Sequence, residues 1–131
     1  MALTRRTRGQ AVIELALVLP LLLLVVFGIT EFGRAWMCMN VLTSAARDGC
    51  RLAVVTAPDI DAVNARVLEV CDAARIVPTA VVVTGPDPLD ISRRVTVRVE
   101  TNFQVVTGNL LGPFSGTIPL RATAVMRHES F

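Results

Sequence analysis

The residues with the clearest chemical meaning lie near the start of the chain, in the segment GQAVIE. Glu14 is the single charged residue of the apolar stretch 9–30, and an acidic side chain near the start of a membrane helix costs free energy unless it has a partner. Cleavage between Gly9 and Gln10 would create an α-amino group four residues before Glu14, and this cation, on the same or a neighbouring chain, is its natural partner. The alternative is a plain signal anchor in which Glu14 simply reaches the membrane interface.

Other residue types that carry catalysis are too isolated to form an active site. His128 is the single histidine, and we expect it to be solvated. Asp59 and Asp61 fit helix capping better than acid–base chemistry, and Asp87 and Asp90 bracket a turn rich in proline. The sequence has no glycine-rich phosphate loop and no His/Cys cluster at metal-ligand spacing. We therefore expect no enzyme activity, no metal and no cofactor.

The three cysteines point to a structural role. In an oxidising compartment, thiols tend to form disulfides. Cys50 lies near the end of a long predicted helix and Cys71 beside the apolar stripe of a second one, so a bridge between them would join the helices and stabilise the domain by about 3 kcal/mol. The alternative is that both are small buried residues, because connectivity cannot be deduced from sequence. If Cys50 and Cys71 form the bridge, Cys38 is left over and would be buried, free or paired with another chain.

The apolar stretch is long enough to cross a membrane. A helix over residues 10–30 would be about 31 Å long at ~1.5 Å per residue, which matches a bilayer core of roughly 30 Å. Because Arg5, Arg6 and Arg8 precede it, the positive-inside rule places the N-terminus in the cytoplasm. We expect three parts: a basic leader at 1–9, a transmembrane and assembly helix at 10–30, and a periplasmic domain at 31–131.

The charge balance does not favour nucleic-acid binding, and we expect no nucleic-acid partner. All 13 basic residues are arginines, against 11 acidic residues, which gives a net charge of +2. Three arginines lie in the expected leader, so the cleaved chain would carry 10 basic and 11 acidic residues, a net charge of −1. The basic character therefore belongs to the leader, and nothing in the composition points to a small-molecule substrate.

Periodicity predicts two helices. Apolar and small residues recur at three- and four-residue spacing and predict one long helix from about residue 11 to about residue 55. Pro20 removes a backbone hydrogen bond within it and favours a kink, which either lets the helix pack against other helices or is an ordinary tolerated bend. A second helix begins at Asp59 or Asp61 and ends near Arg75. The two stripes are Ala35, Met39, Leu42, Ala46, Gly49 and Ala53, then Val63, Val67, Val70 and Ala74.

Alternation predicts three strands, at 79–84, 92–106 and 117–128, in an antiparallel sheet with one buried face. The fold class is therefore α+β. The loop 107–116 carries apolar residues that either seal the core or contact another subunit or the membrane. The side chains that alternate onto one face are Val95, Val97 and Val99 in the second strand, and Ile118, Leu120, Ala122, Ala124 and Met126 in the third. The apolar residues of the loop are Leu110, Leu111 and Phe114.

The first part of the chain resembles a known family. GQAVIE looks like a type IV prepilin processing site, with cleavage after Gly9 and glutamate at the fifth mature position. The fuller string RGQAVIELALVLPLLLLVVFGITEFGRA, followed by LTSAARDGCRLA, resembles the TadE-like pseudopilins of tight-adherence (Flp-type) pilus systems over about the first 55 residues.

The resemblance implies a minor pilin-like subunit or assembly factor of an adhesive pilus. It also implies an anchor in a bacterial inner membrane, with incorporation in an extracellular pilus as a further option. Its implied partners are a prepilin peptidase, other pilins and pseudopilins, the inner-membrane assembly machinery and membrane lipid. Major Flp pilins are little more than a helix, so the domain at 31–131 favours a minor subunit. The alternative is an uncleaved, signal-anchored periplasmic scaffold or binding protein, which the mature N-terminus would distinguish.

Overall fold

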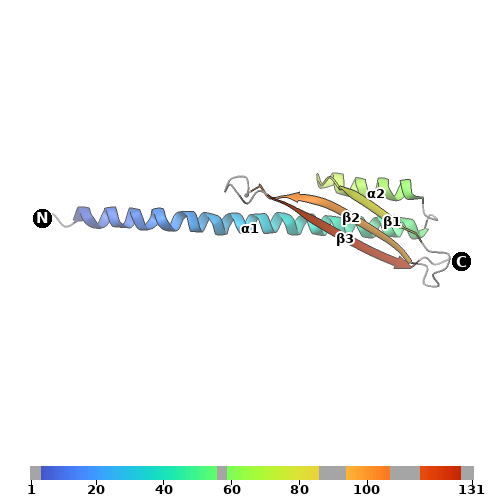
Figure 1. Cartoon of the computed structure of the whole chain (residues 1–131), viewed down its shortest axis with the longest axis horizontal. Coiled ribbons are helices and arrows are strands. Elements are labelled where there is room, and N and C mark those ends of the chain that lie inside the picture. Colours follow the sequence, from blue (N-terminus) through green and yellow to red (C-terminus); the bar gives the residue numbers. More distant parts are fainter. Residues whose placement is uncertain (1–3, 56–58, 86–93, 107–115, 128–131) are drawn as a thin grey trace.

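One long helix runs through the whole structure, and a small domain packs on its second half (Figure 1). The computed structural model describes residues 4–55, 59–85, 94–106 and 116–127. The N-terminal half of the long helix extends away from the domain, as Figure 1 shows. The α+β class, the second helix and the three-stranded antiparallel sheet predicted from sequence are confirmed. The elements are α1 (Thr4–Val55), α2 (Ile60–Ala73), β1 (Ala80–Thr84), β2 (Arg94–Gln104) and β3 (Thr117–Arg127).

The sheet has the order β1-β2-β3, with both pairs antiparallel. Burial alternates along β2: the side chains of Val95, Val97 and Val99 are fully buried beneath the helices, as their spacing predicted. On the other face, Glu100 lies opposite Arg121 in the register of β2 and β3, and their side chains form an ion pair of 2.7 Å. The sheet therefore has one apolar face against α1 and α2 and one polar face.

In β3 the predicted alternation is correct in the middle of the strand and wrong at its start. Ala122 and Ala124 are buried, but Ile118 is 50% exposed although its spacing places it on the same face. Ile118 pairs with Phe103 near the end of β2, beyond the fully buried valines of that strand. Phe103 itself is buried at 8% exposure, so the core reaches β2 at this pair but does not cover Ile118 on β3, and periodicity alone overestimated the burial of Ile118.

The domain half of α1 contributes mostly small residues to the core. Met39 was predicted to lie in the buried stripe but is 36% exposed, while the neighbouring Cys38 is 8% exposed. The buried face is therefore displaced by one position at this end of the stripe. Farther along α1 the predicted positions are correct, and the fully buried side chains there are Leu42, Ala45, Ala46, Cys50 and Ala53.

At Gly49, α1 packs closely against the elements that cover it. A Cβ atom at this position would lie 2.7 Å from Cγ2 of Val67, 3.4 Å from Cγ1 of Val63 and 3.5 Å from Cγ1 of Val97. The first of these distances is shorter than van der Waals contact allows, so only glycine fits without movement of α2. This contact explains a glycine inside a helix, where it is otherwise unfavourable by up to ~1 kcal/mol.

Local signals set the two ends of α2. The Asp59 side chain accepts hydrogen bonds from the backbone N–H groups of Asp61 (3.1 Å) and Ala62 (3.4 Å), which is the N-cap arrangement predicted from sequence. After Ala73 the chain leaves the helix, and Arg75 adopts a positive φ of 57°. The helix thus ends within two residues of the predicted end.

All three cysteines are free thiols buried in this core. The Cys50–Cys71 disulfide expected from sequence is not formed: the Cys50 thiol donates a hydrogen bond of 3.3 Å to the carbonyl oxygen of Val95, so it faces the sheet. Desolvation by burial raises the pKa of Cys38, Cys50 and Cys71 above the ordinary thiol value. The neutral thiols therefore behave as small apolar core residues.

Replacement of Gly49 by alanine tests the close approach of α2. We expect Gly49→Ala to lower the free energy of unfolding by about 1–2 kcal/mol, because overpacking outweighs the better helix propensity of alanine. Urea unfolding in mild detergent, followed by circular dichroism, measures the change. The matched control is Gly33→Ala, whose Cβ would meet no heavy atom within 4 Å, and which should leave stability unchanged or slightly raised. Equal stability of the two variants would contradict the packing described.

Thiol labelling tests the state of the cysteines. A maleimide should react slowly with the folded protein at mildly alkaline pH, because burial shields each sulfur and the raised pKa keeps the thiolate scarce. After unfolding without reductant, mass spectrometry should find label on Cys38, Cys50 and Cys71. A single labelled cysteine would instead demonstrate that two of them had formed a disulfide.

Candidate functional site

The N-terminal half of α1 is an exposed apolar surface. Within Gly9–Val55, α1 has a stretch that is long and apolar enough to cross a membrane, with a mean hydropathy of 2.9 and none of it buried by the domain. Leu17 and Leu21, for example, are 77% and 66% exposed. An exposed apolar surface of this extent requires a lipid or protein partner. The helix therefore fits a single-pass membrane anchor.

The predicted processing residues lie in the first turns of α1. The helix begins at Thr4 rather than near residue 11, so the predicted leader continues directly into the apolar stretch. Gly9, Gln10 and Glu14 are all exposed, and a Cβ at Gly9 would meet no atom within 4 Å. The bond between Gly9 and Gln10 is thus unobstructed by the domain. Among the described side chains, Glu14 forms no ion pair.

The remaining predicted residues of this segment are placed only in part. Arg5, Arg6 and Arg8 belong to the first turns of α1, and their side chains lie outside what the structure describes. Pro20 lies inside α1, which continues through it without a break in the helix, so the kink stays a prediction. Several expectations fall outside the described residues altogether, namely those for Asp87, Asp90, Leu110, Leu111, Phe114 and His128.

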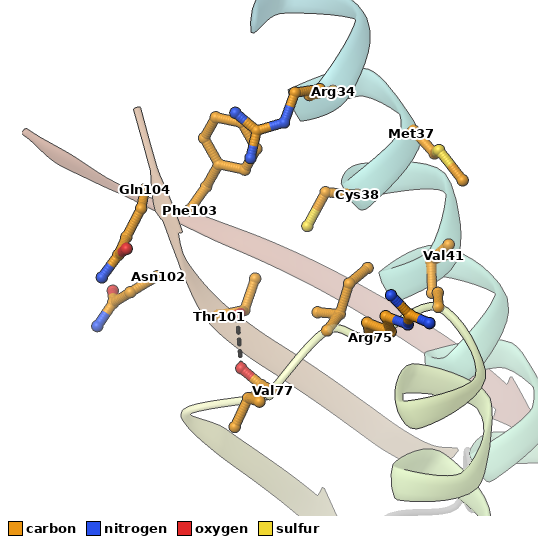
Figure 2. A pocket seen from close by; sticks show the side chains of 12 residues that line it. Arg34, Met37, Cys38, Val41, Arg75, Val77, Thr101, Asn102, Phe103 and Gln104 are labelled. Atoms are coloured by element: carbon orange, nitrogen blue, oxygen red, sulfur yellow. Dashed lines mark hydrogen bonds between the residues drawn. The ribbon is translucent and has the colours of Figure 1, made fainter. Parts of the chain in front are cut away.

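The junction between the apolar half of α1 and the domain is built around Glu31. Its carboxylate accepts a hydrogen bond of 2.7 Å from the backbone N–H of Val106, just past β2, and pairs at 2.9 Å with Arg34 one turn along α1. The Arg34 guanidinium in turn lies over the ring of Phe103, 5.2 Å from its centroid (Figure 2). These contacts hold the end of β2 at the height of Glu31.

A pocket of about 490 Å³ lies beside this junction, between α1, the segment after α2, and β2. Figure 2 shows Arg34 at one side and Arg75 at another, with Met37 and Cys38 between them and Val77 beside Thr101. The Thr101 hydroxyl donates a hydrogen bond of 2.7 Å to the carbonyl oxygen of Val77, which ties β2 to the segment that follows α2. More of the lining residues are apolar than polar, Met37, Cys38 and Val77 among them.

Cys38 is the one thiol among the residues that line the pocket. Burial raises the pKa of the Cys38 thiol, although Arg34 opposes the effect, and this makes Cys38 a poor nucleophile. Among the residues that the structure describes, no group of three His, Cys, Asp or Glu side chains could hold a metal ion.

The contacts of Glu31 were not anticipated from sequence. The signal was present, because Glu31 is the first charged residue after the apolar stretch and a charge at a membrane edge needs a partner. Its partners could not be identified, since Val106 is 75 residues away in the chain and no local pattern joins them.

Comparison with known proteins supports the resemblance seen in the sequence. Searches of curated proteins and of solved structures gave no match. The family model described as "TadE-like protein" matches residues 9–51, which include Gly9, Glu14, the apolar stretch and the core stripe of α1 as far as Cys50. On this match, the segment 9–51, which forms most of α1, is TadE-like.

Proposed function

We propose that this protein is a minor pilin-like subunit or assembly factor of a tight-adherence pilus, and that a prepilin peptidase cleaves it after Gly9. The observation that carries the proposal is the TadE-like match over residues 9–51, which begins at the glycine of the processing motif. A leader at 1–9, a membrane and assembly helix at 10–30 and a periplasmic domain at 31–131 are the parts of this proposal.

The placement of Glu14 suggests how cleavage changes the protein. Before cleavage, the arginine-rich leader holds the N-terminus in the cytoplasm and the chain is an anchored precursor. After cleavage, the new amine of Gln10 and the carboxylate of Glu14 form a complementary pair between neighbouring helices. In an environment with little water such a pair favours one register of packing, and removal of one partner leaves an uncompensated charge.

The domain favours a minor role over that of the major filament subunit. Its sheet and α2 cover the second half of α1, leaving mainly the first half free to pack with other helices (Figure 1). The proposed function is structural: partners would be pilins or pseudopilins, the assembly machinery and lipid. An uncleaved signal-anchored scaffold remains the alternative, because the apolar helix alone fits an anchor equally well.

Substitution of Glu14 tests the role of its charge. Glu14→Ala should abolish or strongly reduce pilus assembly while the protein still inserts in the membrane and folds, because the helix keeps its apolar surface and loses only the partner of the N-terminal amine. Pilus yield by electron microscopy, with protein level in the membrane fraction, is the measurement. Glu14→Asp, which keeps the charge, should retain more assembly.

The matched control is Glu69→Ala, which removes one carboxylate from the exposed surface of α2, where it pairs with Arg66 at 2.8 Å. Such exposed pairs contribute little stability, about 0–1 kcal/mol, so this variant should assemble normally. Normal pili from Glu14→Ala would refute the charge-pairing role of Glu14.

A further inference from the structure

We propose that the end of the domain nearest the apolar half of α1 rests in the phospholipid headgroup layer, with Trp36 and Ile118 among its lipid contacts. The proposal rests on the anchoring of α1 in a membrane, which is one part of the proposed function, but not on cleavage or pilus assembly.

The position of Trp36 follows from the uncharged part of α1. Residues 15–30 contain no charged side chain, and a hydrocarbon core of about 30 Å spans about 20 helical residues. Centred on that segment, the core would reach to about residue 32, and a headgroup layer of roughly 5–7 Å would continue to about residue 37. Phe32 then lies at the edge of the core, and Trp36 lies among the headgroups.

The side chains on this part of α1 suit that position. Phe32 and Trp36 are 70% and 63% exposed, and their rings stack with centroids 6.3 Å apart on one face of the helix. The domain does not cover them, and the apolar surface of residues 15–30 continues into them without interruption. Tryptophan prefers the headgroup level, where its ring is partly apolar and its N–H can meet a polar partner.

The end of the sheet lies at the same height. Because the Val106 N–H contacts the Glu31 carboxylate at 2.7 Å, the end of β2 lies level with the expected edge of the hydrocarbon core. The start of β3 lies beside this end of β2 (Figure 1), and Ile118 there pairs with Phe103. Val106 and Ile118 are 59% and 50% exposed, which is unfavourable in water and favourable against lipid.

The charges at this end are arranged so that the domain can approach lipid. A carboxylate near the membrane edge would be costly to dehydrate if it were alone. Glu31 is not alone: its side chain is only 15% exposed, and both Arg34 and the N–H of Val106 contact it. Arg34 remains 50% exposed and lies at the height of the phosphate groups. One phospholipid surface thus accommodates the aromatic pair, the two aliphatic side chains and the arginine.

The experiment uses the fluorescence of Trp36, the single tryptophan of the chain. The full chain is reconstituted in vesicles of phosphatidylethanolamine and phosphatidylglycerol whose acyl chains carry bromine either close to the headgroup or close to the terminal methyl. We expect shallow bromine to quench Trp36 roughly twofold more than deep bromine, because tryptophan lies at the headgroup level. Aqueous iodide should quench it weakly.

Two variants in a Trp36→Phe background provide the comparison. Ile118→Trp reports on the end of the sheet and should behave like Trp36. Leu68→Trp is the matched control: Leu68 is 48% exposed and follows Val67, which contacts the Gly49 region about 25 Å beyond the expected core edge. Iodide should quench this variant and neither bromine should.

Four results would overturn the proposal. Iodide quenching of Trp36 as strong as that of the Leu68→Trp variant would show that the helix junction stands in water. Quenching of Trp36 by neither iodide nor bromine would show that protein covers it, and stronger quenching by deep bromine would show that α1 inserts farther. Strong iodide quenching of the Ile118→Trp variant would show that the domain stands away from the bilayer. None of these results depends on a pilus, so they leave the assembly role to be judged separately.

Discussion

The close packing of α1 against α2 and the sheet at Gly49 is the contact on which the rest of the structure depends. With a glycine there, Val63 and Val67 of α2 and Val97 of the sheet can approach the helix backbone, and small buried residues such as Ala46 and Ala53 lie on the same part of α1. A helix that is half exposed apolar surface thereby becomes the central element of a folded domain. The apolar half and the domain half belong to one continuous helix, because α1 runs from Thr4 to Val55 without interruption.

This continuity gives the two halves of α1 opposite requirements. The first half needs large apolar side chains on all sides, and the second needs small ones on one face and polar ones on the other. The change occurs near Glu31, where a carboxylate, an arginine and a backbone N–H satisfy one another. The Glu31–Val106 contact therefore ties the end of the sheet to the point of α1 where its surface changes character.

Sequence reasoning recovered the elements because their patterns are local. Alternation placed Val95, Val97 and Val99 correctly, and Asp59 is one of the two residues predicted to cap α2. Errors arose where tertiary contacts decide. Met39 and Ile118 have the right spacing to be buried, but the buried face of α1 includes Cys38 instead of Met39, and the core covers Phe103 but not its partner Ile118. The contact of Glu31 with Val106 and the hydrogen bond of Cys50 to the sheet join distant segments, so no local pattern could reveal them.

The central claim is that cleavage after Gly9 converts an anchored precursor into a subunit ready for assembly. Intact mass and N-terminal sequencing of the membrane-extracted protein, from cells with and without the prepilin peptidase, test it most directly. The account predicts an N-terminus at Gln10 that depends on the peptidase. An uncleaved N-terminus at Met1 or Ala2 with the peptidase present would contradict it, favour the plain anchor, and leave Glu14 in need of a different partner.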